Sequence, residues 1–265
     1  MSINLASSTR FGLTALRNVA EQMEVSQKRL ATGKAVNTAL DNVSKFFTAS
    51  KMDGRAASID TLLDGVNTAQ TALKAASEGI KGIQGIVKQA RALTGQALAT
   101  SDADSRKALS EQFATLTGEI AKVVSDSKLN GTNLLNNESI TVTLNEDGTS
   151  KTTIAGITVG TIAAPAGDWA TEANIKTSVD ALNTFSSTLE TAATSFGTSQ
   201  ALISVRKDFN SALSNILKTG ASELTAADMD AEAANLMALQ TRQQMASTAL
   251  SIMQSTESTA LRLLR

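Results

Sequence analysis

Side chains that commonly perform enzymatic chemistry are scarce in this sequence. Its 265 residues include no His, no Cys and no Tyr, so no imidazole base, thiolate nucleophile or phenol is available. Carboxylates, Ser and Lys remain, and a carboxylate pair or a Ser–Lys site is the enzymatic alternative left open. These residues form no nucleophile motif and no acid-rich cluster. We therefore predict that the protein is not an enzyme and uses no cofactor or metal.

Two short motifs resemble ligand sites but have simpler interpretations. Asp102 and Asp104 have the spacing of the first ligands of a calcium loop, yet no Gly and downstream Glu complete it. Capping of a following helix is the favoured interpretation. Gly79, Gly82 and Gly85 lie inside a helical pattern, so they do not form a phosphate-binding loop. Their shared face indicates either close approach by another chain or simple tolerance of glycine.

Composition favours a thin, helical core over a compact globule. Aromatic residues make up 3% of the chain, while Ala, Leu, Ser and Thr are abundant, as in elongated helical bundles. A net charge of -1 provides no basic field to hold nucleic acid. No run approaches the roughly 20 apolar residues of a membrane span, and the first residues lack the features of a cleaved signal peptide. We predict no nucleic-acid partner and no membrane insertion.

Apolar residues recur every three or four positions through most of the chain, which predicts long helices. The predicted helices cover residues 3–32, 55–99, 104–128, 171–196 and 228–265. A short link joins the second and third of them and predicts an antiparallel hairpin.

Two regions interrupt this periodicity. Residues 33–54 are rich in turn-forming side chains and predict a connector with about one helical turn. Residues 129–170 open with Asn130-Gly131, a strong turn signal, and continue with an alternating strand pattern. One or two further short strands follow up to residue 162. We therefore predict a small β insertion in the middle of the chain.

The phase of the apolar pattern shifts at Gly197. A kink or register shift there is the simplest explanation, after which the seam of the helix is expected to continue until a linker at 220–228. The shifted seam consists of Leu202, Val205, Phe209, Ala212 and Ile216.

Both terminal helices carry an apolar seam that no neighbour in the sequence can bury. A helix with such a seam needs a partner, so residues 3–32 and 228–265 are each other's expected partners. Two polar residues, Gln243 and Glu257, interrupt the second seam. The remaining residues of the predicted seam are Leu13, Leu16, Met23, Leu30, Leu236, Leu239, Leu250, Met253 and Leu264.

Three motifs give the chain a resemblance to a known family. They are RLATGKAVNTALDN at 29–42, LNGTNLL at 129–135 and LMALQTRQQMASTALSI at 236–252. These motifs, at these distances from the chain ends, resemble bacterial flagellin. The short middle is similar to the reduced flagellins of α-proteobacteria.

The resemblance implies a mainly α fold: an elongated antiparallel helical bundle and coiled coil from both chain ends, with a small β insertion in the middle. Residues 1–44 and 221–265 are expected to form the inner-tube coiled coil of a filament. The outer helical domain then comprises 45–135 and 171–220, and 136–170 forms a solvent-facing insertion.

The function implied by the resemblance is that of a structural subunit that polymerises into the flagellar filament and serves motility. Its expected partners are many copies of itself, the flagellar export apparatus with its chaperone, and the hook-associated and cap proteins. The expected location is the extracellular filament, reached by secretion. Gln243 and Glu257 are then expected to face a neighbouring subunit or the channel. A hook–filament junction protein and a non-polymerising helical binding protein are the alternatives.

The family's innate-receptor patch is altered in this chain. Where present, it resembles a Leu-Gln-Arg-Val-Arg-Glu-Leu string, and the aligned string here is Val-Lys-Gln-Ala-Arg-Ala-Leu at 87–93. Gln89 replaces the first Arg and Ala92 replaces Glu, while Arg91 and Leu93 are retained. Losing a guanidinium and a carboxylate removes charge-assisted hydrogen bonds, so we predict weak or absent activation of that receptor.

Overall fold

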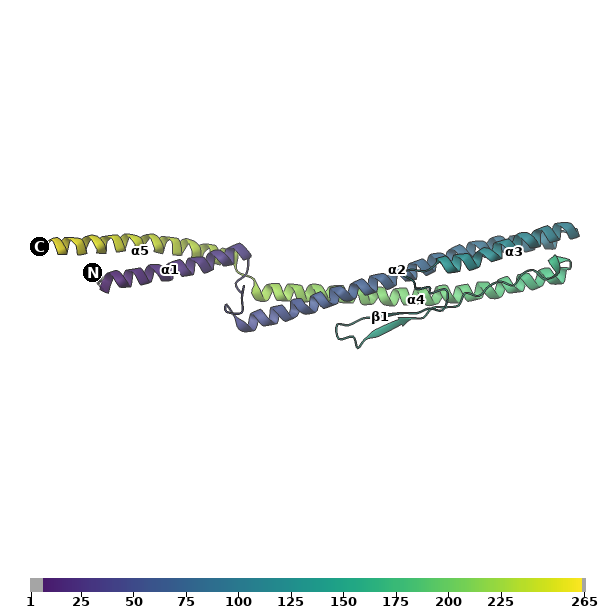
Figure 1. Ribbon diagram of the computed structural model, residues 1–265, viewed down its shortest axis with the longest axis horizontal. Helices are drawn as coiled ribbons and strands as arrows, with labels where there is room; N and C mark the ends of the chain where they lie inside the picture. Colours follow the sequence, from purple (N-terminus) through teal and green to yellow (C-terminus); the bar gives the residue numbers. More distant parts are fainter. Residues whose placement is uncertain (1–6, 264–265) are drawn as a thin grey trace. The chain divides into compact units, whose positions relative to one another are not determined.

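The computed structural model describes residues 7–263, which are mainly helical. The fold confirms the predicted class of a mainly α protein with a small β element in the middle. In chain order the elements are α1 (Ser7–Thr32), α2 (Val43–Ala99), α3 (Ala103–Asp126), β1 (Ile140–Thr143), β2 (Lys151–Ile154), the 3-10 helix η1 (Ala166–Trp169), α4 (Glu172–Thr225) and α5 (Met229–Leu263). Figure 1 shows these elements along the chain.

Two compact units make up the chain. The terminal unit comprises residues up to Gly54 together with those from Ile216 onward, and the central unit comprises Arg55–Asn215. The sequence had suggested divisions at 44/45 and 220/221, so the terminal unit is larger than expected. It includes the start of α2, because α2 begins at Val43 and replaces much of the predicted connector.

In the terminal unit, α1 and α5 run side by side in opposite directions (Figure 1). Gly33 ends α1 in the left-handed conformation, with φ of +68°, as is common after a helix C-terminus. The backbone N–H of Ala35 donates to the carbonyl oxygen of Thr225 at 2.7 Å, and that of Ala227 donates to Gly33 at 2.9 Å. These hydrogen bonds join the two polar connectors and fix the position at which the α1–α5 pair begins.

The central unit is built on the α2–α3 hairpin that the sequence predicted. Asp102 caps α3 by accepting a hydrogen bond from the backbone N–H of Ser105 at 2.8 Å, which accounts for this residue without a calcium ion. At Gly79 the end of α3 approaches α2 so closely that a Cβ atom would lie 2.9 Å from Cβ of Ser127, the C-cap residue of α3. Gly85 has nothing within 4 Å of such an atom. Close approach therefore explains Gly79, and simple tolerance explains Gly85.

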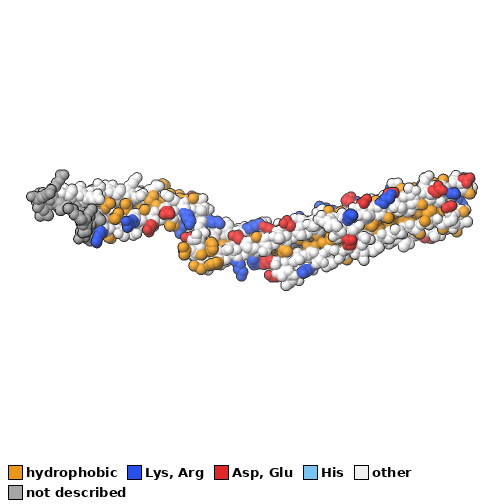
Figure 2. Space-filling model, in the orientation of Figure 1, with side chains coloured by type: hydrophobic (Ala, Val, Ile, Leu, Met, Phe, Trp, Pro, Cys, Tyr) orange, Lys and Arg blue, Asp and Glu red, His pale blue; other side chains and the backbone are white. Residues whose placement is uncertain are grey.

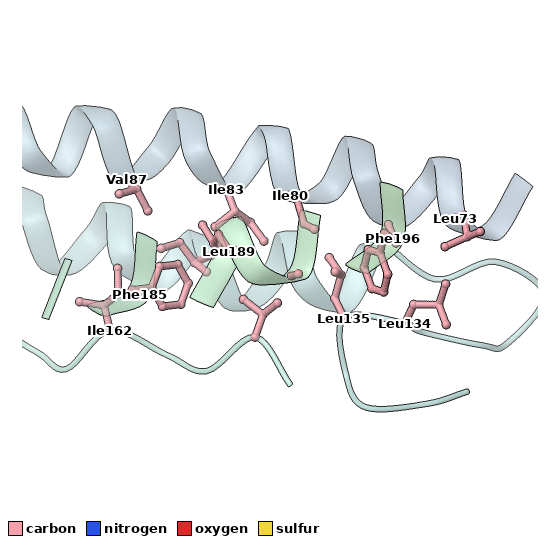
Figure 3. Close-up of a cluster of buried hydrophobic side chains, with 14 of the residues drawn as sticks. Leu73, Ile80, Ile83, Val87, Leu134, Leu135, Ile162, Phe185, Leu189 and Phe196 are labelled. Carbon is pink, nitrogen blue, oxygen red and sulfur yellow. The ribbon is translucent and has the colours of Figure 1, made fainter. Parts of the chain in front are cut away.

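Residues 129–170 contribute apolar side chains to the core of the central unit, and the segment predicted as a solvent-facing insertion, 136–170, has both buried and exposed side chains. One face of the segment is apolar, and its side chains join a single buried cluster with α2, α3 and α4. Figure 3 shows Leu134, Leu135 and Ile162 beside Ile80 and Ile83 of α2 and Leu189 and Phe196 of α4. Trp169 is fully buried, with its ring centroid 5.0 Å from that of Phe113.

The described β structure is one antiparallel pair, with Ile140 opposite Ile154 and Thr143 opposite Lys151. The stretch after β2 runs beside the buried leucines, where the backbone N–H of Ile157 donates to the carbonyl oxygen of Leu134 at 2.7 Å. The tip of the hairpin is held to α2 by an ion pair between Arg55 and Glu146 at 2.6 Å. The hairpin is therefore anchored along its length.

Helix α4 corrects the predicted change of phase at Gly197. The helix continues from Glu172 to Thr225 without a break, and its buried face keeps the earlier heptad phase. Residues seven apart stay buried along it: Leu182, Leu189, Phe196, Ile203 and Asn210. The expected seam was therefore wrong, since Leu202, Val205, Phe209 and Ile216 are 46%, 66%, 57% and 67% exposed and Ala212 is also exposed.

Candidate assembly interface

The predicted seam lies between α1 and α5, but the two helices bury it only in part. Leu239 is buried, with 3% of its surface exposed. Met253, at 36%, is exposed, and Leu264 lies outside the described residues. The other predicted seam residues are half-buried: Leu13, Leu16, Met23, Leu30, Leu236, Gln243 and Leu250. Two helices can cover one stripe on each other, and this pair leaves the edges of the stripe accessible.

Gly12 is a seam residue that the periodic pattern missed. A Cβ atom at this position would lie 3.1 Å from Leu250 Cδ1 and 3.9 Å from Met253 Sδ. Glycine therefore lets α1 approach the leucine of α5 closely. In the sequence, a glycine next to the seam residue Leu13 could have indicated this close approach. Hydrophobic periodicity missed it, because a glycine has no side chain to add to the apolar pattern.

Polar contacts fix the register of the pair near its connectors. The Ser26 hydroxyl, buried at 1% exposure, donates to the carbonyl oxygen of Glu232 at 3.3 Å. Arg29 and Glu232 form an ion pair at 3.8 Å. Arg29 Nε and Glu232 Oε1 are buried without a hydrogen-bond partner among the described residues. They border a surface hollow of about 420 Å³ whose other lining residues include Asn18, Gln22 and Asn235.

Large apolar side chains also lie on the outer surface of the terminal unit. Phe11 of α1 is 77% exposed, and Met237, Met245 and Ile252 of α5 are each at least 60% exposed. Figure 2 shows a further cluster of apolar side chains at the surface where α2 begins, a stretch that includes the exposed Val43 and Phe47. Exposed apolar surface of this extent is characteristic of protein–protein contact regions.

The altered receptor patch lies on the surface of α2 in the central unit. Gln89, Arg91 and Ala92 are exposed and Leu93 is half-buried. Arg91 is directed toward α4, since its Nη2 atom donates to the Ser186 hydroxyl at 3.3 Å. Gln89 and Leu93 border a shallow hollow of about 410 Å³ against α3, lined otherwise by Gln112, Thr115 and Leu116. No charged side chain lines this hollow, so it offers apolar and amide contacts only.

Two aspartate side chains, Asp41 and Asp102, have their pKa values lowered by local hydrogen bonds. Backbone N–H donors from Thr38 and Asn37 hold the pKa of Asp41 below its usual value, and hydrogen bonds from Ser105 lower the pKa of Asp102. Within residues 7–263 no group of three or more acidic side chains gathers as a metal site would require. None of the helices in that range is long and apolar enough to cross a membrane.

A helical protein whose chain ends pair, with a seam that the pair closes only in part, has the features of a structural subunit that assembles with further copies. The comparisons identify the family. A model for the N-terminal helical region of bacterial flagellin matches residues 3–140, and one for the C-terminal helical region matches residues 174–264. The chain belongs to the bacterial flagellin family and is a structural subunit of the flagellar filament, which serves motility.

Individual relatives agree with this assignment. Flagellin FljO of Caulobacter vibrioides is 30% identical, with 100% of this chain and 98% of that protein covered. A flagellin of Brucella melitensis is 27% identical over 100% of this chain and 99% of its own length. The crystal structure of Bacillus cereus flagellin gives a TM-score of 0.49 at 18% identity, covering 54% of this chain and 86% of that chain. The assignment rests on the family models and the full-length relatives.

Proposed function

We propose that the α1–α5 pair is the surface through which copies of this chain polymerise into a filament. The partial burial of its seam is the observation that supports this role most strongly. Leu13, Leu16 and Leu250 each keep part of their surface accessible after the pair has formed. Further burial by a neighbouring copy would be favourable by about 25 cal/mol for each Å² removed from water. Many weak contacts of this kind, repeated in a heterologous arrangement, give an open helical polymer.

Incomplete burial also bears on the unassembled chain. The pair has few fully buried side chains, and isolated helices with unburied seams are marginally stable. The terminal helices are therefore expected to be largely unfolded in the monomer and to fold when neighbouring copies cover them. Gln243, half-buried on the seam, keeps the stripe less apolar before assembly, which disfavours premature aggregation.

Export through the flagellar secretion apparatus, with a chaperone, is the proposed route to the extracellular filament. The chain contains no Cys and a single Pro, Pro165. Unfolded passage and refolding outside then require no disulfide chemistry and at most one prolyl isomerisation. Contacts with hook-associated and cap proteins at the two ends of the filament belong to the same proposal. The full-length matches to flagellins do not favour the junction-protein or binding-protein alternatives.

Electron microscopy of the purified full chain tests the proposal directly. The unaltered chain is expected to form filaments above a critical concentration, and a variant lacking residues 236–265 is expected to remain monomeric. The control variant is Lys151→Gln, which replaces an exposed charged residue of β2 that lies outside the seam. It is expected to form filaments as the unaltered chain does. Normal filaments from the truncated chain, in amounts equal to the control, would contradict the role assigned to the α1–α5 pair.

A further inference from the structure

A tight turn in the central unit is formed by the one Asn-Gly pair of the sequence, Asn130-Gly131. Both residues are exposed, and their φ values are +51° and +86°. On either side of them, the backbone N–H of Leu129 donates to the carbonyl oxygen of Thr132 at 2.9 Å, and that of Thr132 donates to Leu129 at 2.9 Å. Two positive φ values between residues paired in this way define a type I′ turn.

An asparagine followed by glycine can lose its side-chain amide without an enzyme. The backbone nitrogen of Gly131 attacks Cγ of Asn130 and forms a new C–N bond, while the bond from Cγ to the side-chain amide nitrogen breaks. Ammonia leaves with the proton of the Gly131 N–H group, and a succinimide ring remains. Water then opens the ring at either of its carbonyl carbons and gives aspartate or isoaspartate. Glycine favours the reaction because no Cβ atom crowds the attacking nitrogen.

Ring closure requires a backbone geometry that this turn does not have. The Cβ atom of Asn130 and the nitrogen of Gly131 must lie on the same side of the Cα–C bond between them. In a type I′ turn the ψ of the first central residue is about +30°, which places these two atoms nearly opposite each other. A rotation that brought them together would break both hydrogen bonds between Leu129 and Thr132.

Buried residues directly after the turn hold it closed. Leu134 and Leu135 are 1% and 0% exposed and belong to the core of the central unit. Asn133 Nδ2 donates to the carbonyl oxygen of Val124, near the end of α3, at 2.7 Å. The turn therefore opens only when part of the central unit loosens, and such openings are sparsely populated.

We propose that Asn130 is a modification site, which deamidates in the unfolded chain and is protected by its own turn in the folded chain. The proposal does not depend on filament formation, since it concerns folding of the central unit alone. Aspartate at this position is compatible with the turn, because Asp-Gly also favours type I′ geometry. Isoaspartate inserts an additional backbone carbon, which disrupts the paired hydrogen bonds of Leu129 and Thr132. Chains that remain unfolded for long thus acquire a product that refolds less stably.

Peptide mass spectrometry of the full chain tests the proposal, after incubation at one pH and temperature with and without urea. Conversion of Asn130 from amide to acid is expected to be at least about tenfold slower without urea, because the folded chain reacts only from its open form. Asn133 is an internal control in the same short segment. It precedes Leu134, whose side chain crowds the attacking nitrogen, and is expected to react far more slowly than Asn130 in urea.

Two variants separate the turn from other effects. Leu134→Ala removes an anchor of the turn and is expected to speed the reaction without urea, while the rate in urea stays unchanged. Chains with isoaspartate at position 130 are expected to melt about 3 °C or more below the matched Asn130→Asp variant. Equal rates with and without urea, no reaction of Asn130 in urea, or an unchanged rate in Leu134→Ala would overturn the protection by the turn. Equal melting temperatures would overturn the effect assigned to isoaspartate.

Discussion

Gly79 and Gly85 of α2 allow the packing of the central unit to be tested with one chemical change at two positions. Replacing a helical glycine by alanine gains about 1 kcal/mol of helix propensity. At Gly85 the new methyl group has nothing within 4 Å, so Gly85→Ala is expected to stabilise the protein by about that amount. At Gly79 the same methyl group meets the end of α3 and Leu135, and the sign of the effect is expected to reverse.

The geometry at Gly79 sets the size of this reversal. The new Cβ atom would lie 2.9 Å from Leu135 Cδ1 and from Ser127 Cβ, and it would overlap Ser127 Oγ. That hydroxyl cannot move freely, because it bonds to the carbonyl oxygen of Val123 at 2.7 Å. Overpacking of this kind costs about 1–3 kcal/mol, which outweighs the propensity gain. Gly79→Ala is therefore expected to destabilise the protein by about 1 kcal/mol, a gap of about 2 kcal/mol between the two variants.

Thermal unfolding of the full chain, followed by circular dichroism, measures this gap. For a unit of this size, 2 kcal/mol corresponds to a difference in melting temperature of about 4–8 °C. Ser127→Gly in the Gly79→Ala background removes the overlapping atoms and should recover much of the loss, since the two positions are in contact. Equal stabilisation by Gly79→Ala and Gly85→Ala would refute the close approach of α3 to α2 at this point.

Three further predictions concern assembly, pH and receptor signalling. Leu239→Ala removes the most buried leucine of the α1–α5 seam, and it is expected to weaken filaments by about 2–3 kcal/mol per subunit while barely changing the monomer's melting temperature. The dissociation temperature of filaments measures this weakening. An equal loss of stability in the monomer would contradict the prediction. Because the folded-state pKa of Asp41 is lowered, the contribution of its carboxylate to stability is present above the unfolded pKa of about 3.9 and is lost as pH falls through the lower folded pKa. Hydrogen exchange at the Asn37 amide should accelerate in that acidic range. Asp41→Asn should remove this pH dependence. Purified monomer is expected to activate the flagellin receptor weakly or not at all in a reporter assay, and Gln89→Arg with Ala92→Glu should increase the signal; strong signalling by the unaltered monomer would overturn this prediction.

Helical periodicity was sufficient to predict the long helices and the pairing of the two chain ends. It missed the start of α2, where a capping side chain marks the first turn. Asn42 accepts a hydrogen bond from the backbone N–H of Lys45 at 2.9 Å, as an N-cap residue does. Val43 and Phe47 in the first turns are exposed, while Phe46, Ala49 and Met52 face inward, so the apolar residues that follow the cap are spread over more than one face of the helix.

The β segment shows a different limit of the sequence. Its alternating pattern predicted strands, and one pair is present, but the pattern does not reveal what lies against the apolar face. Leu144 and Ile154 are buried against helices that are distant in sequence. Turn signals and strand propensity describe local structure, whereas contact with α2 and α4 depends on how the whole unit closes.

Helix α4 explains why an apolar stripe alone could not locate the core. Periodicity identifies side chains that avoid water, and water can be excluded by the same chain or by another copy. In α4 two apolar stripes are adjacent on one helix: Ile203 and Asn210 face the core, while Val205 and Phe209 face outward. The polar residue, Asn210, belongs to the buried stripe, where its side-chain amide donates a hydrogen bond to the carbonyl oxygen of Leu144. The apparent phase shift after Gly197 therefore comes from a second, exposed stripe that begins at Leu202, while the buried stripe continues through the unbroken helix.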